Sequence, residues 1–596
     1  MARSDPPPSV APASAAGEGI PEAPASGLMA WVPGLWVARH YRVGWLGRDL
    51  VAGLVLTALL VPAGMGYAEA AGLPAITGLY ATVGPLLAYA AFGPSRILVL
   101  GPDSALAALI AAAITAKAAG DPERAVALAS TLALFTGVFC IGAGLARAGL
   151  VTDLLSKPVR VGYMNGMGIS VLLSQLPKLF GVPGGGASTL GSVEHFVRAV
   201  IAGETRLRVL IIGGVCLVVI LVLRAVAPRV PGVLVAVVGA TVAVTLLGEG
   251  GRMAVVGAVP RGIPIPTLPR VHLSELPDLA MAAAGIALVT FTDTSVLSRT
   301  YATRTRFRVD PNRELLGLGA ANLAAGLLRG FPVSSSSSRT PVAESAGSRT
   351  QLTGVVGALA IVALLVAAPG LLQNLPVTAL AAVVVSAALR VLDFGALRAF
   401  YKFRHSDFVL SLVALTGVLV FGALTGIALA VTLSLLDFVR RAWRPHDAIL
   451  GRADGVKGYH DVRRYPTAKQ IPGLLLFRWD APLFFANAET FRGRVVAAVG
   501  RAESPVRWVV IAAEPITDVD TTAADMLEEL DKELAAGNVE LAFAEMKDPV
   551  KDRLERYGLQ KRIGRDFFFP TIGVAVKAFV ARHQATWTDW EETGDA

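Results

Sequence analysis

Between residues 46 and 443 the sequence is a succession of apolar runs, most of them long enough to cross a lipid bilayer. A helix needs about 20 residues to cross roughly 30 Å of hydrocarbon. Only 17% of the 596 residues are charged, against about 25% in an average soluble protein. This excludes an ordinary soluble protein and a disordered one, and it predicts a polytopic α-helical membrane protein. The candidate spans are 48–67, 75–92, 123–146, 159–180, 208–225, 232–248, 277–298, 314–328, 350–369, 375–391, 407–421 and 422–439.

Two further apolar segments, 102–115 and 335–346, are too short to cross the membrane. Each follows a strand-like stretch, 97–101 in the first case and 330–333 in the second. The candidate spans, the two short segments and the apolar pieces near 149–156 together give about 14 membrane elements. The two short segments stand seven elements apart in this order. Paired, interrupted segments in corresponding halves indicate an inverted-repeat transporter with its site at the two interruptions.

Basic residues gather between the spans, in clusters at 39–48, 299–313, 398–404 and 440–444. Cytoplasmic loops carry an excess of Lys and Arg. We therefore expect both termini to be cytoplasmic and the protein to lie in the cytoplasmic membrane. The net charge of +9 would suggest nucleic acid for a soluble chain, but here most of the excess flanks apolar spans, so no nucleic-acid partner is expected.

From about residue 446 the composition becomes that of a soluble protein. Residues 473–478, 508–512 and 540–544 are predicted to be strands, and 520–536 an amphipathic helix, which together indicate a small α/β domain. It contains neither a GxxxxGK[ST] nor a GxGxxG motif. The predicted organisation is a disordered tail (1–30), a transmembrane domain (31–445), a linker (446–470), the α/β domain (471–585) and a C-terminal tail (586–596).

Three charged residues in the apolar region stand out, Asp103, Asp293 and Arg339, because a charge inside an apolar span costs about 2.5–3.5 kcal/mol on insertion scales. Asp103 follows Gly101-Pro102, so it either caps a helix or takes part directly in a cation or substrate site. Asp293, beside Thr294, either binds a coupling ion, Na⁺ or H⁺, or forms a static ion pair. Apart from Na⁺ at Asp293, we expect no metal and no cofactor.

Ser334 to Ser338, followed by Arg339, open the second short segment. The N-terminus of a helix presents unpaired N–H groups and about half a positive charge, and small hydroxyl residues let an anion approach them. The charge of Arg339 opposes the helix dipole and needs a partner. That partner is either a transported anion or a permanent carboxylate: Asp103, Asp293 or Glu344.

Several ordered motifs resemble those of the sulfate permease (SulP) anion transporters. They are Val61–Ala68 with Ala71–Tyr80, Phe92–Arg96, Gly101-Pro102, Lys157-Pro158 with Gly162, Gln175–Gly181, Phe331–Thr340 and Gly347–Thr350. The C-terminal part resembles a STAS domain, with Asp518–Ala523 at a strand-to-helix loop. The resemblance covers roughly residues 30–585.

This resemblance implies two inverted repeats of seven elements, arranged as a core domain (spans 1–4 and 8–11) and a gate domain (spans 5–7 and 12–14), and a homodimer. It places the anion between the starts of the two short segments and the coupling carboxylate at Asp293. The implied anion-binding residues are Tyr67, Gly101, Asp103, Ser104, Ala105, Ser335, Ser336, Ser337, Ser338 and Arg339. Two positions depart from the family pattern: Ala63, where Gln is frequent, and Ser335, where Gly is usual.

The STAS loop carries Thr521 and Thr522 where soluble relatives carry a phosphorylated residue, so these two threonines are candidate regulatory sites. Asp520 before them equally suits a helix N-cap. A cytoplasmic protein or a nucleotide is the expected ligand of this domain.

Together these features predict a secondary active transporter and not an enzyme. Its expected substrate is a small anion of the sulfate, bicarbonate or dicarboxylate class, moved by alternating access and coupled to H⁺ or Na⁺. The alternatives are a channel-like anion conductance and a membrane-anchored anion sensor that signals through the STAS domain. The expected partners are the anion, the lipid bilayer and a second copy of the chain.

Overall fold

The computed structural model describes residues 27–149, 156–184, 189–227, 230–248, 253–305, 309–336 and 338–587. The predictions for residues 1–26, 150–155 and 588–596, and for Ser337, fall outside these ranges. The chain forms two compact units, residues 1–434 and 435–596, and helix α18 (Ala423–Trp443) contains the boundary.

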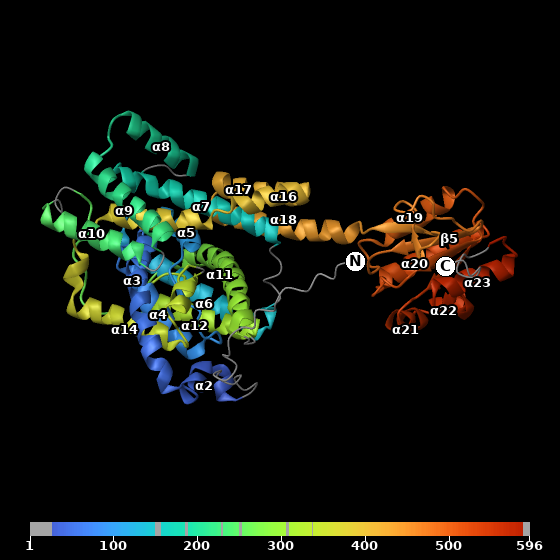
Figure 1. Ribbon diagram of the computed structural model, residues 1–596, viewed down its shortest axis with the longest axis horizontal. Helices are drawn as coiled ribbons and strands as arrows, with labels where there is room; N and C mark the ends of the chain where they lie inside the picture. The colour runs from blue at the N-terminus through green and yellow to red at the C-terminus, as the bar shows by residue number, and fades with distance from the viewer. Residues whose placement is uncertain are drawn as a thin grey trace, which may run out of the picture. The chain divides into compact units, whose positions relative to one another are not determined.

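The first unit is almost entirely helical (Figure 1). Its helices are α1 (Leu28–Trp31), α2 (Pro33–Arg39), α3 (Leu46–Ala70), α4 (Thr77–Phe92), α5 (Ser104–Ala118), α6 (Pro122–Leu145), α7 (Lys157–Phe180), α8 (Thr189–Ile201), α9 (Leu207–Val226), α10 (Gly232–Leu246), α11 (Leu276–Thr305), α12 (Pro311–Leu327), α13 (Thr340–Ser345), α14 (Leu352–Ala367), α15 (Val377–Val391), α16 (Phe394–Phe403), α17 (His405–Phe421) and α18. Short 3-10 helices cover Val43–Trp45, Leu273–Glu275 and Pro369–Leu372.

Within the described residues, five helical stretches are long and apolar enough to cross a membrane, and five shorter helices are also apolar. The predicted spans agree with the helices to within a few residues at most ends, as for α6 and α7. The short amphipathic helices α8 and α16 were not predicted, because neither contains a long apolar run.

The two interruptions meet as a two-stranded antiparallel sheet. Strand β1 (Leu100–Gly101) pairs with β2 (Ser334–Ser335), with Leu100 opposite Ser335 and Gly101 opposite Ser334. Gly101 has a φ of 154°, in the region that favours glycine. The pairing satisfies backbone groups that lipid could not.

The second short segment differs from its prediction as a helix over 335–346. Only Thr340–Ser345 is helical. The serines bond locally instead: Ser336 Oγ accepts from Arg339 N at 3.3 Å and lies 3.2 Å from Ser338 Oγ. Serine side chains compete in this way with helical hydrogen bonds.

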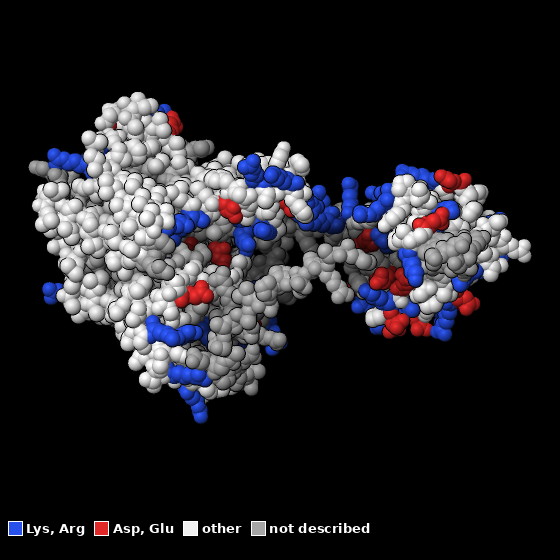
Figure 2. Space-filling view, in the orientation of Figure 1, with Lys and Arg blue, Asp and Glu red and all other residues white. Residues whose placement is uncertain are grey.

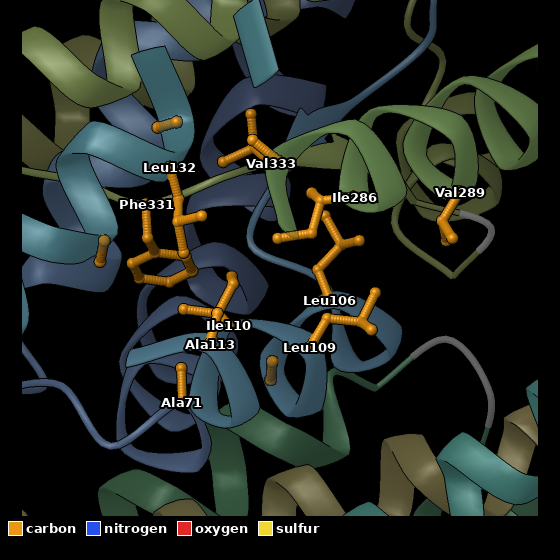
Figure 3. Close-up of a cluster of buried hydrophobic side chains, with 14 of the residues drawn as sticks. Ala71, Leu106, Leu109, Ile110, Ala113, Leu132, Ile286, Val289, Phe331 and Val333 are labelled. Atoms are coloured by element: carbon orange, nitrogen blue, oxygen red, sulfur yellow. The ribbon is translucent and has the colours of Figure 1, made fainter. Parts of the chain in front are cut away.

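Apolar side chains around the interruptions form a continuous core. Figure 3 shows Leu106 and Ile110 of α5 in one cluster with Leu132 of α6, Ile286 of α11 and Phe331. All five side chains are at most 1% exposed. This packing fixes α5 against the segment that leads into β2.

Glycines allow close helix contacts elsewhere in the first unit. A Cβ on Gly162 of α7 would lie 2.0 Å from the carbonyl oxygen of Ser411 in α17. One on Gly78 of α4 would lie 1.9 Å from the carbonyl oxygen of Gly64 in α3. Small residues at helix interfaces are typical of packing in lipid.

The second unit contains a six-stranded sheet in the order β4-β3-β5-β6-β7-β8. Strands β5 to β8 are parallel, and β3 pairs antiparallel with β4 and β5. Helices cover both faces, because Phe491 and Leu527 pack with one apolar cluster and Phe579 with the other. The elements are β3 (Asp447–Arg452), β4 (Tyr459–Asp461), β5 (Leu474–Trp479), α19 (Ala488–Gly500), β6 (Trp508–Ala512), α20 (Thr521–Ala536), β7 (Glu540–Ala544), α21 (Asp548–Arg556), α22 (Leu559–Ile563), a 3-10 helix (Arg565–Phe567), β8 (Phe568–Phe569) and α23 (Ile572–His583). The three predicted strands and the predicted helix are confirmed.

The surfaces of the two units differ in charge. Figure 2 shows broad uncharged areas on the first unit and interspersed Lys, Arg, Asp and Glu over the second. This contrast is the one expected between a lipid-facing and a water-facing surface.

A buried carboxylate joins the start of α3 to the segment before α14. Asp49 is fully buried, and its Oδ1 accepts from Arg349 N at 2.7 Å and from Thr353 Oγ1 at 3.0 Å. Its Oδ2 accepts from Thr350 Oγ1 at 2.8 Å and from Tyr41 Oη at 3.1 Å. Burial and the Asp49 charge raise the pKa of Tyr41 to about 12, so this hydroxyl remains a donor at physiological pH.

We predict that Asp49→Asn destabilises the protein by about 2 kcal/mol or more. The backbone N–H and hydroxyl groups that donate to Asp49 lose their charged acceptor, and the amide N–H₂ group of the new side chain faces them instead. Thermal unfolding of the purified protein measures this loss. Glu123→Gln, at an exposed ion pair with Arg329, should change the midpoint little. Equal midpoints for Asp49→Asn and the parent would contradict the anchoring role.

Candidate functional site

The pairing of β1 with β2 brings the start of α5 beside the serine segment. Asp103 is the N-cap of α5, and its Oδ1 accepts from Ala105 N at 2.9 Å. The predicted capping role is therefore confirmed. Ser104 is the first helical residue and is 5% exposed.

A cavity of about 340 Å³ lies at this junction. Its buried part includes Tyr67, Ser104 and Ser335, which are 4–5% exposed. Its exposed part lies where α7 begins and where α11 and α15 end, with Thr300 and Arg390 at the surface. The lining residues are Tyr67, Asp103, Ser104, Arg160, Met164, Asp293, Val296, Leu297, Thr300, Ser335, Ser338, Ala387, Arg390, Val391 and Asp393. The cavity thus runs from the interrupted segments to one end of the helices.

Arg339 does not line this cavity, although its guanidinium lies directly behind the β1–α5 turn. It is 2% exposed, and Nη2 donates to the carbonyl oxygen of Pro102 at 2.6 Å. Its Nε and Nη1 have no hydrogen-bond partner in the described part of the chain. Among these residues it forms no direct ion pair with Asp103, Asp293 or Glu344, although Asp103 lies near enough for the two charges to interact. A buried cation with so few partners carries a large desolvation penalty, and it makes the turn in front of it electropositive.

Asp293 of α11 lines the cavity and is half-buried. Its carboxylate forms no hydrogen bond or ion pair with the described residues, so the static ion pair is wrong. Thr294 does not line the cavity; its Oγ1 accepts from Ser335 N at 3.4 Å and joins α11 to β2. The described residues contain no group of three or more His, Cys, Asp or Glu side chains that could hold a metal ion.

The other predicted residues divide between the cavity and its support. Ser335 and Ser338 line the cavity. Ser336 supports it, since its backbone N donates to Val99 O at 3.0 Å. Gly101 and Ala105 belong to β1 and α5 and do not line it. Ser337 lies outside the described residues.

Sequence reasoning missed three charged lining residues: Arg160, Arg390 and Asp393. The two arginines stand at the ends of the predicted spans 159–180 and 375–391, and neither was singled out. Asp393 lies in the two-residue break between α15 and α16, and its Oδ1 accepts from Ala396 N at 2.8 Å. The signal that could have identified these three residues is a charge at the end of a span that faces the interrupted segments.

In the second unit, Thr521 and Thr522 are exposed in the first turn of α20. Asp520 caps this helix, with Oδ1 accepting from Ala523 N and Oδ2 from Phe485 N, both at 2.8 Å. The capping interpretation of Asp520 is confirmed, and phosphorylation of the threonines stays a prediction.

Comparison with known proteins matches a family to each of the two units. The sulfate permease family matches residues 46–414, and the STAS domain family matches residues 465–575. A probable sulfate transporter of Mycobacterium tuberculosis is 42% identical over 553 residues, which are 93% of this chain and 98% of that protein. Sulfate transporter 4.1 of Arabidopsis thaliana is 29% identical over 581 residues, or 92% and 83% of the two chains.

Solved structures share the fold at lower identity. The murine solute carrier 26 member A9 anion transporter in its inward-facing state has a TM-score of 0.85 at 23% identity and covers 93% of this chain and 94% of that chain. The transmembrane domain of the cyanobacterial bicarbonate transporter BicA has a TM-score of 0.57 at 24% identity, over 65% of this chain and 98% of that chain.

We predict that Arg339→Gln lowers the affinity for sulfate at least tenfold, about 1.4 kcal/mol, because the turn before α5 loses its nearby positive charge. Sulfate-dependent thermal stabilisation of the purified protein measures this change. Arg329→Gln, which removes an exposed charge paired with Glu123, serves as the matched control. A folded Arg339→Gln protein with parental affinity would remove Arg339 from the site.

Proposed function

The chain belongs to the sulfate permease family, and from its cavity we propose that it is a secondary active transporter of a small anion of the sulfate, bicarbonate or dicarboxylate class. It is a multi-pass membrane transporter with a STAS domain and not an enzyme. The observation that carries the proposal is the buried end of the cavity, where the N-terminus of α5 and Ser335 stand in front of Arg339. Sulfate is the first anion to test, because the 42% identical relative is described as a probable sulfate transporter.

Three carboxylates also line the cavity, from Asp103, Asp293 and Asp393. A site built only for an anion gains nothing from carboxylates, whose charge repels the substrate. We therefore infer that a cation, H⁺ or Na⁺, moves with the anion. Asp293 is the strongest candidate to bind it, because Asp103 and Asp393 are already engaged as helix caps.

Alternating access is supported by a contact at the far end of α7. Lys178 Nζ donates to the backbone oxygen of Glu69 at 2.7 Å and to its Oε2 at 3.1 Å. This pair links the C-terminal ends of α7 and α3, whereas the cavity reaches the surface at the start of α7. The cavity is thus open at the start of α7, and an ion pair joins the helices at the opposite end of α7. This arrangement favours a transporter over an open channel.

We further propose a homodimer in the cytoplasmic membrane with both termini in the cytoplasm. The basic residues at the open end of the cavity, Arg160 and Arg390, support this orientation, because cytoplasmic ends of spans are enriched in Lys and Arg. The state described here then opens to the cytoplasm.

We predict that Asp293→Asn reduces gradient-driven sulfate uptake into proteoliposomes at least tenfold, while the protein folds and binds sulfate. The amide keeps the volume but neither takes a proton nor offers Na⁺ a full charge. Uptake is measured with a Na⁺ gradient and, separately, with a pH gradient, which identifies the cation. Asp278→Asn alters an exposed residue of the same helix and should transport normally; concentrative uptake by Asp293→Asn at the parental rate would contradict the coupling role.

We also predict that Lys178→Met increases the fraction of molecules in which the cavity is accessible from the C-terminal end of α7. The reporter is Ser335→Cys with the two buried cysteines, Cys140 and Cys216, replaced by Ala. A membrane-impermeant thiol reagent added at the α7 C-terminal side should label Lys178→Met about three to ten times faster than the parent, since a half-buried pair is worth about 1 kcal/mol. Lys117→Met, at an ion pair with the exposed Asp278, should not change the rate. Equal rates for Lys178→Met and the parent would show that this pair does not hold the far end closed.

A further inference from the structure

Three buried amide side chains bind the non-helical segments that lead to the cavity. Asn322 of α12 is fully buried; its Oδ1 accepts from Val333 N at 2.9 Å and its Nδ2 donates to Val333 O at 3.2 Å. The Nδ2 group also donates to Leu318 O, one turn back in its own helix, at 3.0 Å. The amide thus fixes the residue directly before β2, which carries Ser335.

Asn165 of α7 makes the same set of contacts at the break between α15 and α16. It is fully buried, and its Oδ1 accepts from Asp393 N at 2.7 Å. Its Nδ2 donates to Asp393 O at 3.4 Å and to Val161 O, one turn back, at 2.9 Å. This break carries Asp393 and follows Arg390, and both line the exposed part of the cavity.

Gln351, at the start of α14, binds the third segment. It is 8% exposed, and its Nε2 donates to Ser95 O at 2.8 Å and to Leu98 O at 2.9 Å. These carbonyls belong to the stretch that continues into β1 and the Asp103 cap. Each of these three non-helical segments is therefore bound by a neutral amide from a neighbouring helix.

An amide suits this position for a physical reason. Non-helical backbone at membrane depth leaves both N–H and C=O groups without partners, and each unsatisfied buried group costs free energy. Asn and Gln supply a donor and an acceptor without introducing a charge. A carboxylate or a cation in the same place would add a field to the cavity and compete with the transported ions.

We propose that Asn165, Asn322 and Gln351 are positioning residues of the transport site, each setting the geometry of one cavity wall. This inference rests on the proposed function for its effect on anion affinity, but the positions of the backbone segments are testable without a transported anion. Asn322 sets the wall that contains Ser335, and Asn165 sets the rim that contains Arg390 and Asp393.

The test compares Asn322→Ala and Asn165→Ala with Asn374→Ala. Asn374 is a half-buried asparagine whose Nδ2 donates to Thr245 Oγ1 at 3.1 Å, and neither residue lines the cavity. We expect the first two variants to raise the KM for sulfate at least fivefold, with the maximal rate per folded protein within twofold of the parent. Asn374→Ala should leave both parameters unchanged. If Asn322→Ala does not fold, Asn322→Ser shortens the side chain while keeping a neutral donor and acceptor.

A second measurement needs no substrate. The labelling rate of Ser335→Cys in the purified protein should change at least threefold in Asn322→Ala and remain unchanged in Asn374→Ala. If this rate responds while the parent transports no anion, the proposed function fails and the positioning role stands. Parental KM and parental labelling in folded Asn322→Ala, or a loss of folded protein with no change in either quantity, would overturn the positioning role.

Discussion

Unpaired backbone inside a membrane is the constraint on which the rest of this structure depends. Leu100–Gly101 and Ser334–Ser335 resolve it by pairing with each other across more than 200 residues of sequence. The helical turns that the two segments give up are replaced by a short sheet and by the amide side chains of Asn322 and Gln351. Because the interruptions meet in one place, they create the small polar cavity in an otherwise apolar bundle.

The charges around the cavity follow from the same arrangement. Arg339 reaches behind the β1–α5 turn and bonds to Pro102 O, so its charge acts on the cavity without occupying it. Asp103 satisfies the first turn of α5, and Asp293 projects from α11 without a partner among the described residues. An anion and a cation can thus share one site, since positive potential comes from behind the turn and negative charge from the walls. Arg160 and Arg390 add positive charge where the cavity reaches the surface.

Much of the fold could be predicted from the sequence, because long apolar runs and basic flanks are strong local signals. The apolar runs located α6 and α7 nearly residue for residue, and the strands of the second unit followed from short buried segments. The serine segment was harder, because local hydrogen bonds from Ser336 shortened the expected helix to Thr340–Ser345. Arg160, Arg390 and the amide contacts of Asn165 were missed because their roles depend on partners far away in the chain. The sequence therefore predicted the part of the candidate site that lies at the interruptions, but it did not predict the residues at the exposed rim of the cavity.

The most direct test of this account is to locate the bound anion. Selenate has the shape and charge of sulfate and scatters X-rays anomalously, so a structure of the full chain with selenate would show its position. The account predicts one anomalous peak within hydrogen-bonding distance of Ser104 and Ser335, and a weaker peak in Arg339→Gln at a selenate concentration below saturation. A peak only elsewhere in the protein, with this cavity empty at saturating selenate, would contradict the assignment of the transport site.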